Sequence, residues 1–345
     1  MISIFTVQHK RHDPAHEIFR GERVPCFEAV ARGSILRDAL VAHGHELRAP
    51  TIDAGPLLAR VHDPRYLNFL EGAWDEWLKL DPANADLQPF PSVWPIRSLR
   101  ADVEPADFIA KLGFFSMDNG TPLAAGTWPA VRAAADAAVT AASLVVAGER
   151  AVFSATRPPG HHAGRDFMGG YCFLNYSALA ATALLDGGAA RVAILDVDYH
   201  HGNGTQSLFE ERADVLTLSL HADPRHEFPF YLGHADETGR GAGLGANANF
   251  PMAPGTDAAT WFAALDQATT RIAAFAPDAL VVPLGLDTYV GDPLSSFQLT
   301  ADDFLRLGAR LQKLNLPTVL VLEGGYAVAE LGENAARVLD GFAGA

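Results

Sequence analysis

Apolar stretches alternate with helical segments over most of this chain, and five of the apolar stretches end in polar residues. The five stretches start at residues 152, 194, 215, 280 and 318, and the helical segments span residues 129–146, 174–185, 257–275, 301–314 and 328–342. Because strands that alternate with helices form crossover units, this order predicts a parallel sheet covered by helices on both faces. The ligand crevice of such a sheet lies beyond the carboxyl ends of its strands, where all five polar endings fall.

The polar ending at residues 196–201 indicates a metal site. Alternate side chains of a strand share a face, so Asp196, Asp198 and His200 point the same way where the strand ends. Two carboxylates and an imidazole suit a divalent cation, zinc among them. The alternative is a capped strand end with solvated polar side chains, but buried charges rarely lack a partner or a ligand. Asp287 ends another apolar stretch and can reach the same sheet edge.

Charge and cysteine content exclude several classes of protein. The net charge is −15, with 41 acidic and 26 basic residues, which argues against nucleic acid as a partner and would attract a cationic ligand. Cys26 and Cys172 are too few for a disulfide framework and are typical of a reducing compartment. Residues 1–5 indicate a first strand rather than a signal peptide, and no stretch approaches the roughly 20 apolar residues that span a bilayer. We therefore expect a cytoplasmic enzyme with one domain, 1–345, and no membrane partner.

The segment from about residue 74 to residue 122 is the least regular part of the chain. It contains Trp74, Trp77 and Trp94 together with several prolines. Long segments without periodicity tend to form lids, binding loops or interfaces. The segment is therefore expected to form either a channel rim or dimer contact, or else a surface insertion without a role.

Five motifs carry a resemblance to a known family. They are Pro159-Gly160-His161-His162-Ala163, Asp196-Val197-Asp198-Tyr199-His200-His201-Gly202, Ser219-Leu220-His221, Asp287 with Gly291-Asp292-Pro293, and Glu323-Gly324-Gly325-Tyr326. In this order they resemble the motifs of histone deacetylase-like zinc amidohydrolases, over residues 62–326. The tryptophan-bearing segment, residues 228–233 and Tyr199 look most like bacterial acetylpolyamine amidohydrolases.

The resemblance implies the arginase-deacetylase fold, an α/β single domain in which a predominantly parallel eight-stranded sheet lies between helices. It implies that Asp198, His200 and Asp287 bind one Zn²⁺ ion. It also implies a structural K⁺ or Na⁺ ion beneath the active site. The matching positions for that ion are Asp196, Asp198, His200, Ser219 and Leu220. Bacterial members use an insertion in dimer contacts that narrow the channel, so a homodimer is expected.

The resemblance further implies that His161 and His162 are a tandem catalytic pair and that Tyr326 polarises the substrate carbonyl. In the family pattern, Asp196 would orient His161 and Asn203 would accept a hydrogen bond from His162. A carboxylate favours the imidazolium form, whereas an amide orients a ring without adding charge. We therefore expect His161 to be the more cationic histidine and His162 to be the neutral general base.

These residues make chemical sense for amide hydrolysis. Three protein ligands leave zinc an open position for water and for the carbonyl oxygen. A histidine takes the proton of the water, and the same or a neighbouring histidine returns one to the leaving amine. The tyrosine hydroxyl and zinc stabilise the oxyanion. The expected reaction is zinc-dependent hydrolysis of the acetyl amide of acetylated polyamines or other small acetylated amines, releasing acetate and the free amine.

Substrate residues follow from the resemblance as well. Tyr171 and Phe228 match two rings that flank the methylene chain of the substrate, and Asp118 is a candidate for holding a distal ammonium or a substrate amide. Eukaryotic polyamine deacetylases carry an acidic gatekeeper after the Gly-Asp-Pro motif, where this chain has Leu294. A preference for polyamines must therefore come from elsewhere, such as Asp118, Glu17 or the insertion.

Two alternatives remain open at this point. An open active-site rim would favour acetyl-lysine in proteins as the substrate. The second alternative is a catalytically silent metal-binding protein, and the intact set of ligands, histidines and tyrosine speaks against it.

Overall fold

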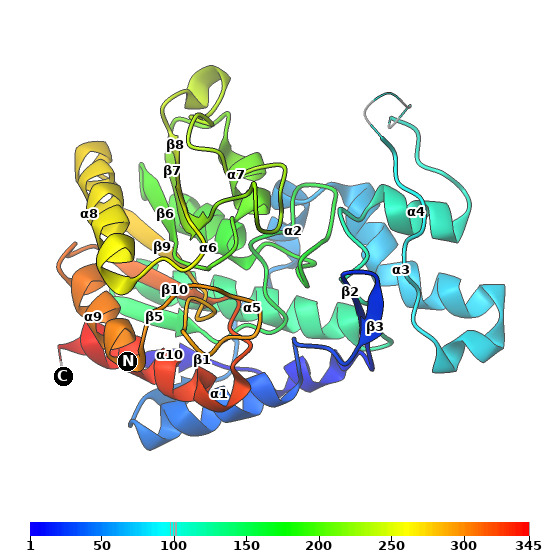
Figure 1. The fold of residues 1–345 in the computed structure, drawn as a ribbon, viewed down its shortest axis with the longest axis horizontal. Helices are drawn as coiled ribbons and strands as arrows, with labels where there is room; N and C mark the ends of the chain where they lie inside the picture. Colours follow the sequence, from blue (N-terminus) through cyan, green and yellow to red (C-terminus); the bar gives the residue numbers. More distant parts are fainter. Residues whose placement is uncertain (97, 99, 101, 345) are drawn as a thin grey trace.

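The computed structural model describes residues 1–96, 98, 100 and 102–344, and an eight-stranded sheet lies at its centre (Figure 1). Each pair of neighbouring strands in this sheet runs parallel. In sheet order the strands are β4 (Glu46–Arg48), β1 (Ile2–Ile4), β5 (Ala151–Ser154), β10 (Thr318–Leu322), β9 (Ala279–Leu284), β6 (Val192–Asp196), β7 (Val215–Ala222) and β8 (Asn247–Met252). The predicted fold, a predominantly parallel eight-stranded sheet between helices, is confirmed.

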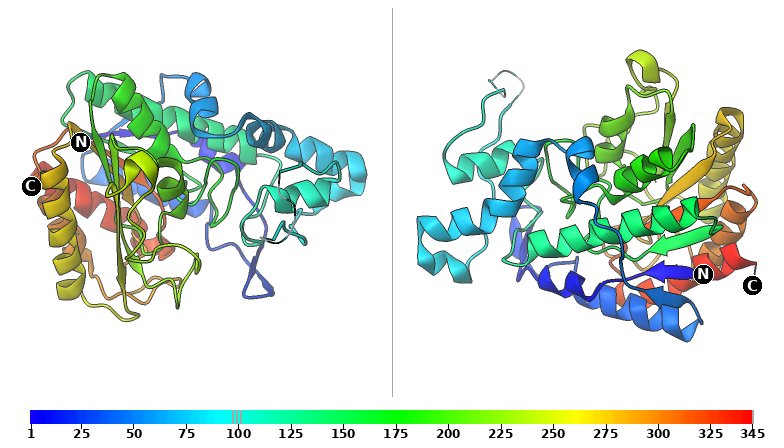
Figure 2. Two further views of the ribbon diagram at one scale, coloured as in Figure 1. Left: turned by 90° about the horizontal axis from the view of Figure 1, so that it is seen from above. Right: turned by 180° about the vertical axis from the view of Figure 1, so that it is seen from behind.

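Two hydrophobic cores lie on the two faces of the sheet because successive side chains of each strand point to opposite faces. In β10, Val319 and Val321 enter one core, whereas Leu320 and Leu322 enter the other. The first core is covered by α2 (Gly55–Val61), α3 (Pro64–Leu80), α4 (Phe108–Phe114), α5 (Thr127–Val146) and α6 (Tyr176–Asp186). The second is covered by α1 (Ala31–Ala42), α8 (Ala258–Phe275), α9 (Ala301–Gln312) and α10 (Val328–Ala343). Figure 2 shows these layers from above and from behind.

Side-chain caps decide where several predicted helices begin. The helix predicted from residue 174 starts at Tyr176, because the Asn175 side chain accepts a hydrogen bond from the backbone N–H of Ala178. Thr300 and Asp303 form a capping box that starts α9 at the predicted residue. The predicted helix boundaries are therefore correct to within a few residues.

Helix α5 corrects one expectation from the sequence. By length and composition it is the one helix among the described residues that could cross a membrane, although no stretch was expected to approach that length. Most of α5 is buried, and it packs against α6 and β5. The apolar side chains of α5 therefore pack into the core between the sheet and the helices beside α5.

The irregular insertion predicted over residues 74–122 is more regular than expected. Trp74 and Trp77 belong to α3, which the side chain of Asp63 caps by accepting from the N–H of Arg65. The Trp77 ring stacks on Phe108 of α4, with 5.8 Å between ring centroids. The segment between α3 and α4 begins with a short 3₁₀ helix, Pro82–Asp86, and three of its positions (97, 99 and 101) lie outside the described residues. Figure 1 shows α3, α4 and this segment at one side of the sheet, beside the small β2–β3 hairpin (Glu17–Phe19 and Glu22–Val24).

Candidate active site

Loops from five neighbouring strands meet at one edge of the sheet. The strands are β5, β10, β9, β6 and β7, which are adjacent in this order. Their carboxyl ends lead into residues 155–162, 323–326, 285–287, 197–203 and 223. The polar endings found in the sequence therefore converge, as expected for an open parallel sheet.

Asp198, His200 and Asp287 form a buried group whose ligand atoms lie within 4.8 Å of one another. His200 Nδ1 lies 3.0 Å from Asp287 Oδ2 and 3.3 Å from Asp198 Oδ1. Zinc bonds of about 2.0–2.1 Å in a tetrahedral site would separate ligand atoms by roughly 3.3 Å, so this spacing fits zinc. The other carboxylate oxygens are held by backbone N–H groups, Asp198 Oδ2 by Gly324 and Asp287 Oδ1 by Tyr199.

The electrostatics of this group also fit a cation. Burial, followed by the neighbouring Asp198 carboxylate, raises the pKa of Asp287 to about 7. Burial also opposes ionisation of Asp198, but His161 and His200 hold its pKa well below the usual range. The two buried carboxylates carry more negative charge than the one imidazole between them can offset, and a bound divalent cation would neutralise the remainder.

His161 and His162 are both buried, but they have different partners. His161 Nδ1 lies 2.9 Å from Asp196 Oδ2, and His162 Nδ1 lies 2.6 Å from Asn203 Oδ1. Burial lowers the pKa of His161, yet Asp196 and Asp198 outweigh it and raise that pKa to about 10. Burial and the charge of His161 lower the pKa of His162 well below its ordinary value. The pair therefore consists of one cationic and one neutral imidazole.

The loop that carries the two histidines is attached to the end of β10 through Glu323. This buried carboxylate accepts hydrogen bonds from the N–H groups of Gly160 (2.6 Å) and His161 (3.0 Å). Ser177 donates to its other oxygen at 3.1 Å. The sequence showed Glu323 only as the first residue of a motif, and these contacts with residues some 160 positions away give it a positioning role.

Tyr326 is oriented by Asp292, which the sequence showed only as part of a motif, and by Arg32, which it did not single out. Asp292 Oδ2 accepts hydrogen bonds from the N–H groups of Tyr326 and Ala327. Arg32 of α1 donates to the carbonyls of Gly325 (2.8 Å) and Glu323 (2.6 Å), and its guanidinium lies 5.2 Å from the Tyr326 ring centroid. No local pattern links Arg32 to Tyr326, because the carbonyls to which it donates are nearly 300 residues away in the chain.

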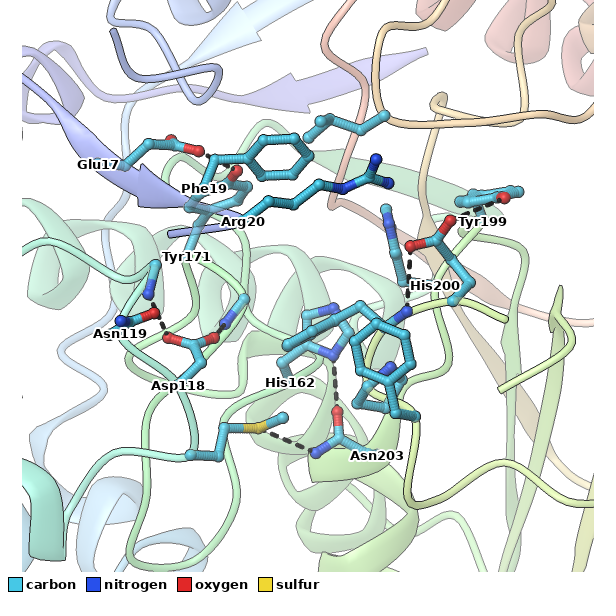
Figure 3. Close-up of a pocket in the computed structure, with 18 of the residues that line it drawn as sticks. Glu17, Phe19, Arg20, Asp118, Asn119, His162, Tyr171, Tyr199, His200 and Asn203 are labelled. Carbon is cyan, nitrogen blue, oxygen red and sulfur yellow. Dashed lines mark hydrogen bonds between the residues drawn. The ribbon is translucent and has the colours of Figure 1, made fainter. Parts of the chain in front are cut away.

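A cavity of about 750 Å³ opens beside this group and is bordered by His162, His200 and Tyr326. Figure 3 shows Glu17, Tyr171 and Asp118 on one side of it and Tyr199 on the other. Other bordering residues, which the sequence did not single out, include Arg20, Met117 and Glu227.

Each of the three predicted substrate residues borders the cavity. The Phe228 ring lies 5.0 Å from the His162 ring, and the Tyr171 ring lies 5.5 Å from the Tyr326 ring. Both carboxylate oxygens of Asp118 accept backbone hydrogen bonds, one from Gly170 at 2.6 Å and one from Gly120 at 3.0 Å.

Three of the positions predicted for a monovalent cation lie on two neighbouring strands. Asp196 of β6 is paired in register with Ser219 of β7, and Leu220 is the next residue of β7. The Ser219 hydroxyl lies 2.8 Å from Nδ1 of His221. Asp198 and His200, the other two predicted positions, belong to the group described above with Asp287.

Comparison with known proteins assigns the family. A model of the histone deacetylase domain matches residues 22–342. The chain belongs to the histone deacetylase family. Acetylpolyamine amidohydrolase 2 of Pseudomonas aeruginosa is 49% identical to this family member over 345 residues, which are 100% of this chain and 99% of the relative. The acetylpolyamine amidohydrolase of Mycoplana ramosa is 44% identical over 99% of each chain.

A solved structure extends the similarity to the fold. The crystal structure of acetylpolyamine aminohydrolase from Burkholderia pseudomallei superposes on this histone deacetylase family member with a TM-score of 0.94 at 40% identity. The match covers 99% of this chain and 98% of the other. The resemblance seen in the motifs is therefore confirmed at the level of family and fold.

Proposed function

We propose that this protein is a zinc-dependent amidohydrolase that removes the acetyl group from acetylated polyamines or other small acetylated amines. The observation that carries the proposal is similarity over the full length, at 44–49% identity, to proteins named acetylpolyamine amidohydrolase. The cavity of about 750 Å³ beside the Asp198–His200–Asp287 group supports it.

In the proposed mechanism, Asp198, His200 and Asp287 hold the zinc ion. When bound there, zinc would supply Lewis acidity that polarises the acetyl carbonyl and lowers the pKa of water. His162, whose Nδ1 is engaged by Asn203, accepts the proton of the attacking water at Nε2. His161 remains cationic beside Asp196 and balances negative charge in the transition state.

Tyr326 completes the proposed mechanism by donating its hydroxyl proton in a hydrogen bond to the oxyanion. Burial raises the pKa of Tyr326 well above its ordinary value, so the hydroxyl stays protonated and able to donate. A protonated histidine then gives a proton to the leaving amine, which departs as the free amine while acetate remains.

The proposed substrate is a small cation. The methylene chain would lie between Tyr171 and Phe228, and the distal ammonium would approach Glu17 and Asp118. Tyr171 donates to Glu17 Oε1 at 2.8 Å, which links the aromatic wall to a carboxylate.

We further propose that residues 1–345 form one deacetylase domain, acting in the cytoplasm as a homodimer with a structural K⁺ or Na⁺ ion. One sheet takes strands from Ile2 to Leu322, which supports a single domain. Cys26 and Cys172 are unpaired, as is common in a reducing compartment. The insertion carries several exposed apolar side chains, and such a patch supports a dimer contact. These exposed side chains are Leu80, Leu87, Val93, Ile96 and Val103.

The test is a side-by-side measurement of kcat/KM on acetylputrescine, acetylcadaverine, acetylspermidine and an acetyl-lysine peptide. We expect the acetylated amines to be the better substrates. A preference for the peptide would instead favour a protein deacetylase. Asp287→Ala serves as the control, because it should lose both stoichiometric zinc and activity. Normal metal content and turnover in that variant would overturn the proposed metal site.

A further inference from the structure

The cavity wall around Leu294 contains a carboxylate from a different loop. Leu294 occupies the position where an acidic side chain would select a cation, and Ser296 lies two residues further on. The Tyr199 hydroxyl lies 3.0 Å from the Ser296 hydroxyl and donates to Glu227 Oε2 at 3.3 Å. Tyr199 thus joins Glu227 to the Leu294 segment, and all four residues border the cavity.

Glu227 is held in place but keeps room to accept further hydrogen bonds. Its Oε1 accepts from the N–H of Phe228 at 3.1 Å, so each oxygen has one donor. A carboxylate oxygen can accept about two hydrogen bonds, which leaves capacity for an ammonium group. The Tyr199 ring that orients Glu227 is buried, with Phe297 at 4.7 Å and His200 at 4.9 Å between ring centroids. Tyr199 is therefore a closely packed anchor for Glu227.

In the part of the chain that the structure describes, three acidic side chains border the cavity, and Glu227 is the one that lies beside Tyr199. Glu17 and Asp118 lie on the opposite side, as the labelled residues of Figure 3 show relative to Tyr199. Arg20 borders the cavity too, with its guanidinium 5.1 Å from the Phe19 ring centroid, and no ion pair joins it to a carboxylate of the described residues. A substrate ammonium would find a carboxylate on either wall of the cavity. The Arg20 guanidinium would compete with that ammonium for the carboxylates.

We propose that Glu227, positioned by Tyr199, is a specificity-determining residue that binds a distal ammonium of acetylated polyamines and replaces the acidic gatekeeper missing at Leu294. The inference rests on the proposed deacetylase function. Substrates with two ammonium groups can use both walls at once, so they should depend on Glu227 more than acetylated diamines do.

The experiment compares Glu227→Gln with wild type on three acetyl amides. These are acetylspermidine, acetylputrescine and N-pentylacetamide, which has the shape of acetylputrescine but no charge. Glutamine keeps the shape and an acceptor oxygen, so the main change is the lost charge. Asp236→Asn is the matched control, because it removes one negative charge from an exposed position of the same loop region outside the cavity.

We expect Glu227→Gln to lower kcat/KM about tenfold for acetylspermidine, less for acetylputrescine and not at all for N-pentylacetamide. Asp236→Asn should leave kcat/KM unchanged for all three amides. Arg20→Gln should raise kcat/KM for acetylspermidine relative to kcat/KM for N-pentylacetamide. An equal loss on all three amides would show that Glu227 only supports the loop, and no loss on acetylspermidine would also overturn the inference. Wild-type protein that hydrolyses none of the amides would instead refute the deacetylase function itself.

Discussion

Two adjacent histidines of this site differ in charge because one has a carboxylate partner and the other an amide. His161 faces Asp196, and His162 faces Asn203. Burial lowers the pKa of both rings, but the carboxylates of Asp196 and Asp198 outweigh it at His161, whereas His162 has no such carboxylate partner and its pKa is lowered further by the charge of His161. At the residue scale, the residue that each histidine contacts therefore decides its role as much as the histidine ring itself does.

Replacing Tyr326 with Phe tests the oxyanion donor. The ring would keep its contacts with Arg32 and Tyr171, so the variant should fold and bind zinc as wild type does. Loss of one oxyanion donor lowers kcat by roughly 10²–10³. Steady-state kinetics and metal analysis measure both effects. Tyr66→Phe is the control, because it removes a buried hydroxyl that donates to Phe173 O, outside the cavity. A Tyr326→Phe enzyme within a few-fold of wild type would make the tyrosine structural.

Glu17 should make stability depend on pH. Burial raises its pKa from an ordinary value of 4.5 to about 7. Between these values the folded protein keeps a proton that the unfolded chain has released, so stability falls as pH rises through this window and levels off above it. Glu17→Gln removes this dependence while keeping an acceptor for the Tyr171 hydroxyl.

Thermal unfolding of both proteins at pH 4.5 and pH 8 measures the effect of Glu17. From pH 4.5 to pH 8, we expect Tm of the wild type to decrease. This decrease should exceed the decrease for Glu17→Gln by roughly a few degrees. Identical pH dependence in the two proteins would mean that burial does not penalise the Glu17 carboxylate.

At the scale of elements, the insertion contacts the segment before Glu17 through Gln88. Its side chain accepts hydrogen bonds from the N–H groups of Ala15 and His16, at 3.0 and 3.1 Å, and donates to the His16 carbonyl. These residues directly precede β2, which begins at Glu17. The insertion therefore supports the wall of the cavity that carries Glu17.

Gln88→Ala should loosen that wall. We expect kcat/KM for acetylputrescine to fall about three- to tenfold, because the segment before Glu17 loses three hydrogen bonds. Turnover of N-pentylacetamide should change less. Asn84→Ala is the control within the same insertion, because the Asn84 side chain donates to the carbonyl of Trp77, within the insertion itself. An equal effect of the two variants would mean that the insertion acts through general stability alone.

At the scale of the whole molecule, the proposed homodimer would form through the exposed apolar side chains of the insertion. The net charge of −15 disfavours close contact between two chains except where apolar surface compensates. Leu87 and Val93 are exposed apolar residues of the insertion. A contact built on such residues excludes water from both copies.

The double variant Leu87→Glu and Val93→Glu should be monomeric. Light scattering should give the wild type the mass of two 36.8 kDa chains and the variant the mass of one. Val41→Glu together with Val146→Glu is the control, since these residues are also exposed but lie elsewhere on the surface. A wild-type monomer, or a variant that stays dimeric, would contradict an interface built on the insertion.

The sequence by itself determined the parallel sheet and the edge at which the polar residues that follow its strands collect. These features follow from local patterns, because apolar stretches that alternate with helices make the sheet parallel and the strand ends set the edge. The family resemblance selected Asp198, His200 and Asp287 as the zinc ligands and added the roles expected for His161 and His162.

Only the tertiary structure decided the remaining features. It turned α5 into a core helix, extended α3 through Trp74 and Trp77, and brought Arg32 to the loop before Tyr326. It also joined Glu227 to Tyr199 at the cavity wall. Each of these outcomes depends on contacts between distant parts of the chain, and periodicity within a short window carries no information about such contacts.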